Sequence, residues 1–138
     1  MSSIGTRRVL RPDPRSLDRR EEHHRADFSA CHLSDTTVLV TVRGEIDAAN
    51  SRALSDYIER QIAGWPRLVL DVSGIEFFGT AGFATLHHIN VICAQYRASW
   101  ALVVGPQLRR FLKICDPDNL LPLEDSVVEH TDAGPRDR

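Results

Sequence analysis

The stretch from Leu68 to Tyr96 constrains the fold of this chain more than any other part of its sequence. It opens with a short apolar run of β-prone residues, and Asp71 marks the point where a buried strand would reach solvent. After Gly79, apolar residues recur mostly at helical spacing, at Phe83, Leu86, Ile89, Val91, Ile92 and Cys93. The stretch therefore predicts a buried strand, a loop bounded by Gly74 and Gly79, and a long helix.

Thr80 is the predicted N-cap of this helix, because a hydroxyl residue directly before a helical segment can accept a hydrogen bond from the first turn. A cap hydroxyl lies at the positive end of the helix dipole, where a phosphate group would face free backbone N–H groups. The position is thus chemically suited to phosphorylation. The alternative interpretation is an ordinary structural cap, which is the common use of Thr at such a place.

Two strands and a helix are predicted before this stretch. Asp27 to His32 and Thr36 to Arg43 alternate or run apolar around a short turn, which indicates an antiparallel hairpin. Gly44 is expected to end the second strand, and Asp47 to cap a helix from Ala48 to about Ala63. The apolar stripe of that helix consists of Ala49, Ala53, Leu54, Tyr57, Ile58 and Ile62.

Shorter elements follow the central stretch. Trp100 to Val104 predicts a third buried strand, Gln107 to Ile114 a short helix, and Leu120 to Leu123 a brief edge strand, with one or two helical turns over residues 125–130. Helices between successive strands are what parallel crossover connections require. The predicted fold class is therefore α/β, a sandwich in which helices cover a mixed, mostly parallel sheet of four to five strands.

Length and composition predict a single folded domain. A chain of 138 residues that is 42% apolar can build one core. We expect that domain over residues 26–131, with a disordered tail at 132–138. Residues 1–25 carry seven Arg against Asp13, Asp18, Glu21 and Glu22, and their few apolar residues predict a disordered basic arm. Residues 1–24 are accordingly expected to be dispensable for folding.

Charge and hydropathy exclude several functions. The net charge of −2 provides no basic field for nucleic acid. The early arginines precede no apolar signal core, and no apolar run approaches the length of a membrane span. We therefore expect a soluble, cytoplasmic protein that binds neither nucleic acid nor membrane.

No pattern in the sequence predicts catalysis. The run from Gly74 to Gly79 has the glycine spacing of a phosphate-binding loop, but Thr80 stands where that motif requires Lys. His87 and His88 are adjacent and so point about 100° apart on a helix, whereas helical zinc sites use the i, i+4 spacing. A G-x-S-x-G nucleophile motif is absent from the sequence. We expect no enzymatic activity, cofactor or metal.

The cysteines allow two interpretations. Cys31, Cys93 and Cys115 are odd in number and form no C-x-x-C pair, as is typical of reduced thiols in a cytosolic protein. If the two helices that carry Cys93 and Cys115 pack side by side, these thiols could instead join in a disulfide and act as a redox switch.

Two motifs resemble a known family. The run from Asp71 to Phe83, DVSGIEFFGTAGF, is similar to the pattern D-x-S-x-x-x-x-x-D-S-x-G of STAS domains, the bacterial anti-sigma factor antagonists. Thr80 falls on the residue that a partner kinase phosphorylates in that family, and Gly79 stands where most members have Asp. Upstream, the segment from Gly44 to Asp47 resembles the family's G-E-[LI]-D element. The resemblance covers residues 27–128.

The resemblance implies a regulator of transcription, and of the stress response, that acts through protein binding. Such a protein binds an anti-sigma factor, in some cases a GHKL-type serine/threonine kinase, and thereby releases a sigma factor. We expect a monomer or weak dimer, regulated by phosphorylation at Thr80 or by thiol redox. The alternative is a STAS scaffold or ligand-sensing module without an anti-sigma partner.

The expected docking face combines loops at the carboxyl edge of parallel strands with the start of the second helix. Its residues are Gly44, Glu45, Asp47, Ser73, Phe77, Phe78, Gly79, Thr80, Ala81 and Phe83. Phe77 and Phe78 are the candidate apolar anchors. The alternative for each ring is ordinary inward packing against the core.

Overall fold

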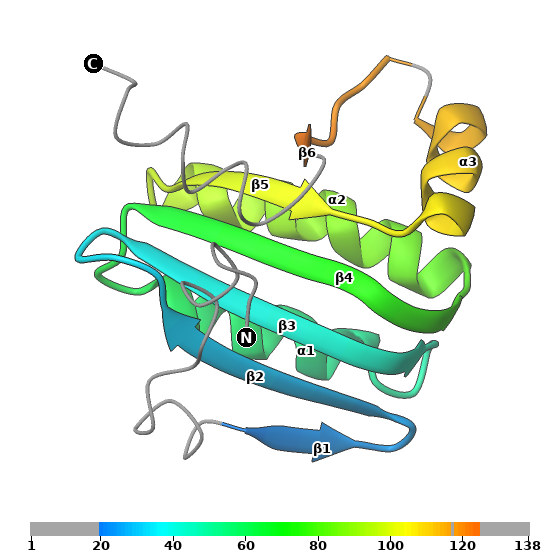
Figure 1. Cartoon of the computed structure of the whole chain (residues 1–138), viewed down its shortest axis with the longest axis horizontal. Coiled ribbons are helices and arrows are strands. Elements are labelled where there is room, and N and C mark those ends of the chain that lie inside the picture. The colour runs from blue at the N-terminus through cyan, green and yellow to red at the C-terminus, as the bar shows by residue number, and fades with distance from the viewer. Residues whose placement is uncertain (1–19, 117, 125–138) are drawn as a thin grey trace, which may run out of the picture.

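A computed structural model describes residues 20–116 and 118–124 of the chain. Its sheet has the spatial order β1-β2-β3-β4-β5-β6, and α1 and α2 both lie on the same face of that sheet (Figure 1). The elements are β1 (Glu21–His23), β2 (Ala26–His32), β3 (Thr37–Ile46), α1 (Ser51–Ile62), β4 (Arg67–Phe78), α2 (Thr80–Gln95), β5 (Ser99–Val103), α3 (Pro106–Cys115) and β6 (Leu123–Glu124).

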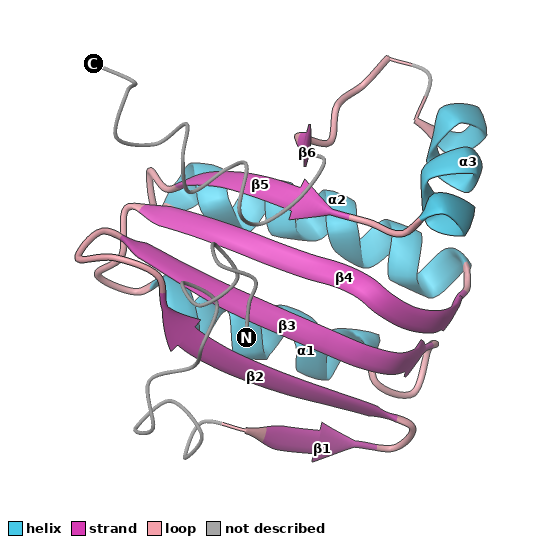
Figure 2. Ribbon diagram, viewed as in Figure 1, coloured by secondary structure: helices cyan, strands magenta, loops and turns pink. Residues whose placement is uncertain are grey.

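The sheet is mixed, as the sequence predicts. β1, β2 and β3 pair antiparallel, whereas β3, β4, β5 and β6 pair parallel. The crossovers from β3 to β4 and from β4 to β5 run through α1 and α2 on the same side of the sheet (Figure 2). The predicted α/β sandwich is confirmed, as are the hairpin of β2 and β3, the strand β5 and the helix α3. An edge strand is also present, but β6 spans Leu123–Glu124, so only Leu123 of the residues predicted for it belongs to it.

The sheet has six strands instead of the expected four or five, because the segment Glu21–His23 is a strand and not part of a disordered arm. Glu21 lies opposite Phe28 of β2 in the pairing register. The His23 ring stacks on the Phe28 ring with 5.2 Å between centroids, and Arg60 of α1 donates a hydrogen bond to the Glu21 carboxylate. These contacts with distant segments stabilise residues that composition alone assigned to the arm.

Several other expectations lie outside the described residues. They are the remainder of the predicted arm over residues 1–19, the helical turns expected over 125–130 and the predicted tail at 132–138.

The core lies between the sheet and the two helices. Leu68, Leu70 and Val72 of β4 point into it, as strand alternation requires. On α1, the predicted stripe supplies the buried side chains Leu54, Tyr57, Ile58 and Ile62. Ala49 was expected in this stripe but lies before the helix and is exposed.

Both central parallel strands run further than their sequence suggests. β3 continues through Gly44 to Ile46, and β4 continues to Phe78 over most of the predicted loop. The two extensions pair with each other, so their backbone groups form a ladder although many of the side chains are polar or exposed. Side-chain composition, on which the boundary predictions rested, does not reveal this pairing.

Candidate functional site

The two family-like motifs lie side by side at the carboxyl ends of β3 and β4. Glu45 is the register partner of Phe77, and Ile46 is the partner of Phe78. The Gly79 N–H donates to the Ile46 carbonyl at 3.3 Å, which continues the contact past the end of β4. The structure thus brings together the two segments that the sequence assigned to one docking face.

β4 contains two extra residues where it passes the end of β3. It advances three positions from Asp71 to Gly74 while β3 advances two from Thr41 to Arg43. A second irregularity follows, where β3 advances by one residue and β4 by two, from Ile75 to Phe77. Such bulges bend a strand and redirect its side chains, and the end of β4 curves in Figure 1.

Asp71 organises the first irregularity. Its Oδ1 accepts hydrogen bonds from the Ser73 N–H at 2.9 Å and from the Ser73 hydroxyl at 2.6 Å. This local turn explains the D-x-S spacing, since an Asp side chain reaches the backbone two residues further on. Ser73 itself is exposed and belongs to the predicted docking face.

The neighbouring aromatic residues Phe77 and Phe78 have different environments. Phe77 is 55% exposed. Phe78 is half-buried against the core, and a Cβ atom placed on Gly82 would lie only 2.7 Å from its ring. Inward packing therefore holds for Phe78, whereas Phe77 is available to a partner.

A groove of about 220 Å³ lies beside Phe77. Its lining combines the end of β4 with one side of α3 and consists of Ile75, Glu76, Phe77, Phe78, Gln107, Leu108 and Phe111. Phe83 of α2 packs edge-on against Phe111, with 5.9 Å between ring centroids, and against His87 at 4.6 Å. Phe83 is half-buried, so its main role in this structure is to hold α3 beside the start of α2.

Thr80 is the first residue of α2 and not its N-cap, which corrects the sequence-based expectation. The N-cap is Gly79, whose carbonyl accepts hydrogen bonds from the N–H groups of Gly82 at 3.0 Å and Phe83 at 3.1 Å. Within the part of the chain that the structure describes, no side chain caps this first turn. Thr80 is exposed, so its hydroxyl lies at the helix N-terminus and on the surface.

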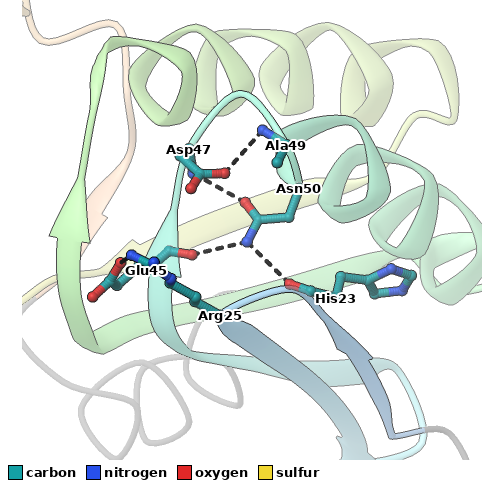
Figure 3. Close-up of polar contacts among 6 residues, drawn as sticks. All are labelled: His23, Arg25, Glu45, Asp47, Ala49 and Asn50. Atoms are coloured by element: carbon teal, nitrogen blue, oxygen red, sulfur yellow. Dashed lines mark hydrogen bonds and ion pairs between the residues drawn. The ribbon is translucent and has the colours of Figure 1, made fainter.

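Asn50 holds the segment Gly44–Asp47 in place, as Figure 3 shows. This side chain is fully buried. Its Oδ1 accepts from the Asp47 N–H at 3.0 Å, while its Nδ2 donates to the Glu45 carbonyl at 2.9 Å and to the His23 carbonyl at 3.1 Å. All polar atoms of the amide are therefore used, and they join three separate backbone positions.

Sequence reasoning assigned the cap of α1 to Asp47 and missed Asn50. The helix begins at Ser51, and Asn50 occupies its N-cap position, although the Asn50 side chain makes no capping hydrogen bond. The Asp47 carboxylate accepts from the Ala49 N–H at 2.9 Å and forms a turn before the helix. An Asn directly before a helical Ser is itself a capping signal, and it could have indicated the later start.

The β1–β2 turn touches the same segment. The Glu45 N–H donates to the Arg25 carbonyl at 3.1 Å, and the Arg25 guanidinium donates to the Glu45 carboxylate at 3.3 Å. Gly44 has φ +99°, and a Cβ atom there would lie 2.1 Å from the Arg25 carbonyl oxygen. Only glycine fits this close approach.

The structure does not bring Cys93 beside α3, which carries Cys115. Cys31, Cys93 and Cys115 all lie within the described residues, and none of them forms a disulfide there. The contact of Phe83 with Phe111 sets α3 against the first turns of α2 (Figure 1), whereas Cys93 lies ten residues, or about 15 Å, further along the helix. Burial raises the pKa of the Cys93 thiol to about 12, so its reactive thiolate form is suppressed.

Residues 20–116 and 118–124 contain neither a helix that could span a membrane nor a cluster of metal-binding side chains. None of the helices there has the length and apolar character needed to span a lipid bilayer. The same residues hold no group of three or more His, Cys, Asp or Glu side chains placed to bind a metal ion.

The fold and the two paired motifs define a STAS domain. The sequence profile of that family matches residues 30–130, and the chain belongs to the STAS domain family. Among solved structures, it is similar to an anti-sigma factor antagonist from Mycobacterium paratuberculosis, with 27% identity and a TM-score of 0.67 over 81% of this chain and 95% of that one. The unphosphorylated anti-sigma factor antagonist SpoIIAA has the same fold, with a TM-score of 0.64 at 13% identity over 79% of this chain and 96% of that one.

Two curated relatives come from Mycobacterium tuberculosis. The anti-sigma-F factor antagonist RsfA is 29% identical over 93 residues, which are 64% of this chain and 73% of RsfA. Osmosensory protein A is 37% identical over 75 residues, which are 54% of this chain and 48% of that protein, so the match spans about half of that relative. The solved structure from Mycobacterium paratuberculosis and RsfA are thus both named as anti-sigma factor antagonists.

Proposed function

We propose that this protein is an anti-sigma factor antagonist, which binds an anti-sigma factor and thereby releases a sigma factor. Its docking surface consists of Gly44–Asp47 and Ser73–Ala81. The observation that carries the proposal is the pairing of Glu45 with Phe77, because it joins both family motifs in one surface with an exposed aromatic ring three residues before Thr80. The family membership and the named relatives support it.

Phe77 is the proposed apolar anchor of the docking surface. Aromatic residues are enriched among the side chains that contribute most to binding at interfaces. Burial of the exposed part of this ring, with an apolar partner side chain in the adjoining groove, would contribute about 1.5–3 kcal/mol. A contribution of this size changes affinity by roughly ten-fold or more.

Phosphorylation of Thr80 is the proposed off-switch. A phosphate adds about −1.5 to −2 charges at neutral pH, and the first-turn N–H groups of α2 can accommodate it in the free protein. A partner that covers Thr80 must remove water from that charge, and a poorly paired buried charge costs several kcal/mol, enough for a loss of affinity of about 100-fold or more. The kinase would be the anti-sigma factor itself, of the GHKL type. Gly79 provides no carboxylate next to the phosphoacceptor.

Regulation through a disulfide between Cys93 and Cys115 is disfavoured. Burial and the raised pKa of Cys93 disfavour its reaction, and α3 lies beside the other end of α2.

Ligand sensing has one observation in its favour. An open groove of about 600 Å³ runs between α1 and α2, lined by Ser51, Arg52, Ser55, Asp56, Glu59, Ala81, Ala84, Thr85 and His88. Its volume is within the range of small-molecule sites. A saturable rise in the thermal midpoint with one compound from a metabolite panel, abolished by Ala84→Trp, would support this second function.

A titration calorimetry experiment tests the proposed function. The chain is titrated with each anti-sigma factor encoded in the same genome, and one of them should bind. Phe77→Ser should weaken that binding about ten-fold or more. Val91→Ser is the matched control, since Val91 is 51% exposed on α2 outside the docking surface, and it should leave affinity unchanged. Lack of binding to every anti-sigma factor, or equal losses in both variants, would contradict the proposal.

A further inference from the structure

We infer that Asn50 is the positioning residue of the docking surface, and that it acts by tying the segment Gly44–Asp47 to the β1–β2 turn. The inference rests on the proposed function and adds to it that the N-terminal hairpin, which lies outside both family motifs, belongs to the functional unit. Asn50 itself is fully buried, so it would act on binding without contacting the anti-sigma factor.

The Asn50 amide forms three hydrogen bonds with the backbone. Its NH₂ group donates to two carbonyls, one from β1 at His23 and one from β3 at Glu45. Its oxygen accepts from the Asp47 N–H. A carboxylate of the same shape could still accept that one bond, but it has no hydrogen to donate to either carbonyl. Only an amide satisfies the three positions together at this size.

The β1–β2 turn accepts hydrogen bonds at two of its carbonyls. The carbonyls of His23 and Arg25 flank His24, whose φ is +58°. One of them accepts from Asn50, and the other accepts from the Glu45 N–H. Hydrogen bonds on both sides of His24 therefore hold the turn against the segment Gly44–Asp47, and Gly44 permits the close backbone approach.

Side-chain contacts anchor the β1–β2 hairpin to the rest of the domain. β1 is joined to α1 through the hydrogen bond from Arg60 to Glu21, and the His23 ring stacks on Phe28 in the core layer. Asn50 thus links the docking segment to elements that are already fixed by the core. A surface ordered before contact loses less conformational entropy on binding, so its partner affinity depends on this link.

The test compares Asn50→Asp with Ile62→Val in the full chain. Ile62 is buried at the far end of α1, so its variant loses core packing without touching the docking surface. Affinity for the anti-sigma factor is measured by calorimetry where both variants are fully folded by circular dichroism. Asn50→Asp should bind about ten-fold more weakly and exchange the Glu45 amide hydrogen faster, whereas Ile62→Val should stay within about twofold of wild type in both. Equal affinity of the two variants would overturn the inference.

A measurement on the unmodified protein covers the case in which Asn50→Asp does not fold. The amides of Glu45 and Asp47 should be protected from hydrogen exchange in the free protein to the same degree as the β3 amide of Val40, because both donate to fixed acceptors. Exchange at the unprotected rate would overturn the inference. Failure of the wild-type chain to bind any anti-sigma factor would instead contradict the proposed function. The exchange result would then still show whether Asn50 holds the segment Gly44–Asp47 against the β1–β2 turn.

Discussion

The ring of Phe78 occupies the space that a side chain at Gly82 would need. A Cβ atom on Gly82 would lie 2.7 Å from that ring, closer than real contacts allow. The last residue of β4 thereby packs directly on the first turn of α2, in which Thr80 is the first residue. This contact gives the glycine of the family-like motif a packing role.

Gly82→Ala should therefore destabilise the fold. The added methyl group forces Phe78 out of its position, and overpacking of this kind costs about 1–3 kcal/mol in the free energy of unfolding. Urea denaturation measures the loss. Gly74→Ala is the matched control, since Gly74 is exposed and its Cβ would meet nothing closer than the Arg43 side chain, at an ordinary 3.4 Å. A control variant as unstable as Gly82→Ala would show that the packing explanation is wrong.

Thr80 variants should separate binding from stability. Because Thr80 is not the cap of α2, Thr80→Ala should change the free energy of unfolding by less than about 0.5 kcal/mol and keep partner binding. Thr80→Glu should keep the circular dichroism spectrum and bind the anti-sigma factor about ten-fold or more weakly, since it carries one charge into the interface. Wild-type affinity in Thr80→Glu, together with no modification by the kinase and ATP, would remove the switch and leave docking intact.

Deletion of residues 1–24 should lower the thermal midpoint by several degrees, contrary to the sequence-based expectation. The deletion removes β1, the Glu21 carboxylate that Arg60 binds and the His23 carbonyl that Asn50 binds. Deletion of residues 1–19 keeps all three contacts and serves as the comparison in differential scanning calorimetry. Equal midpoints for the two truncated chains would show that β1 adds no stability.

Glu21 should make stability depend on pH in the acid range. Burial alone would raise the pKa of its carboxyl, but the hydrogen bond with His23 and the charge of Arg60 outweigh burial, so the pKa is lowered. A group with a lowered folded-state pKa contributes stability above its unfolded pKa of about 4.3, and this contribution disappears as pH falls through the folded value. Glu21→Gln should thus have a lower thermal midpoint than wild type at pH 7, and the two should converge as the pH falls below the folded-state pKa of Glu21. A difference that stays constant with pH would contradict this account.

Cys93 should resist alkylation in the folded protein. With a pKa of about 12, its thiolate fraction at pH 8 is about 10⁻⁴, and the side chain is buried. Iodoacetamide followed by peptide mass spectrometry should modify the partly exposed Cys115 first. After oxidation, a peptide that links Cys93 to Cys115 would revive the redox switch.

Much of the fold follows from local patterns. The apolar run at Leu68 to Leu70, the alternation of the β2–β3 hairpin and the helical spacing after Gly79 each predicted an element that the structure contains. The two glycine-containing motifs also identified the segments that meet at the carboxyl edge of the sheet. These features are short-range, because strand and helix periodicity repeat within a few residues.

The sequence by itself thus determined the order of the elements from β2 to β6, the α/β class and the family. Only the tertiary structure decided that β1 joins the sheet, that Phe78 turns inward while Phe77 stays exposed, that Gly79 rather than Thr80 caps α2, and that Asn50 joins three backbone positions. For β1 and Asn50 the physical reason is contact between segments far apart in the chain, as between His23 and Asn50, and such contacts exist only once the strands have paired and the helices have packed. For Phe78 and Gly79 it is the exact direction of the backbone where β4 ends and α2 begins, which residue types alone do not specify.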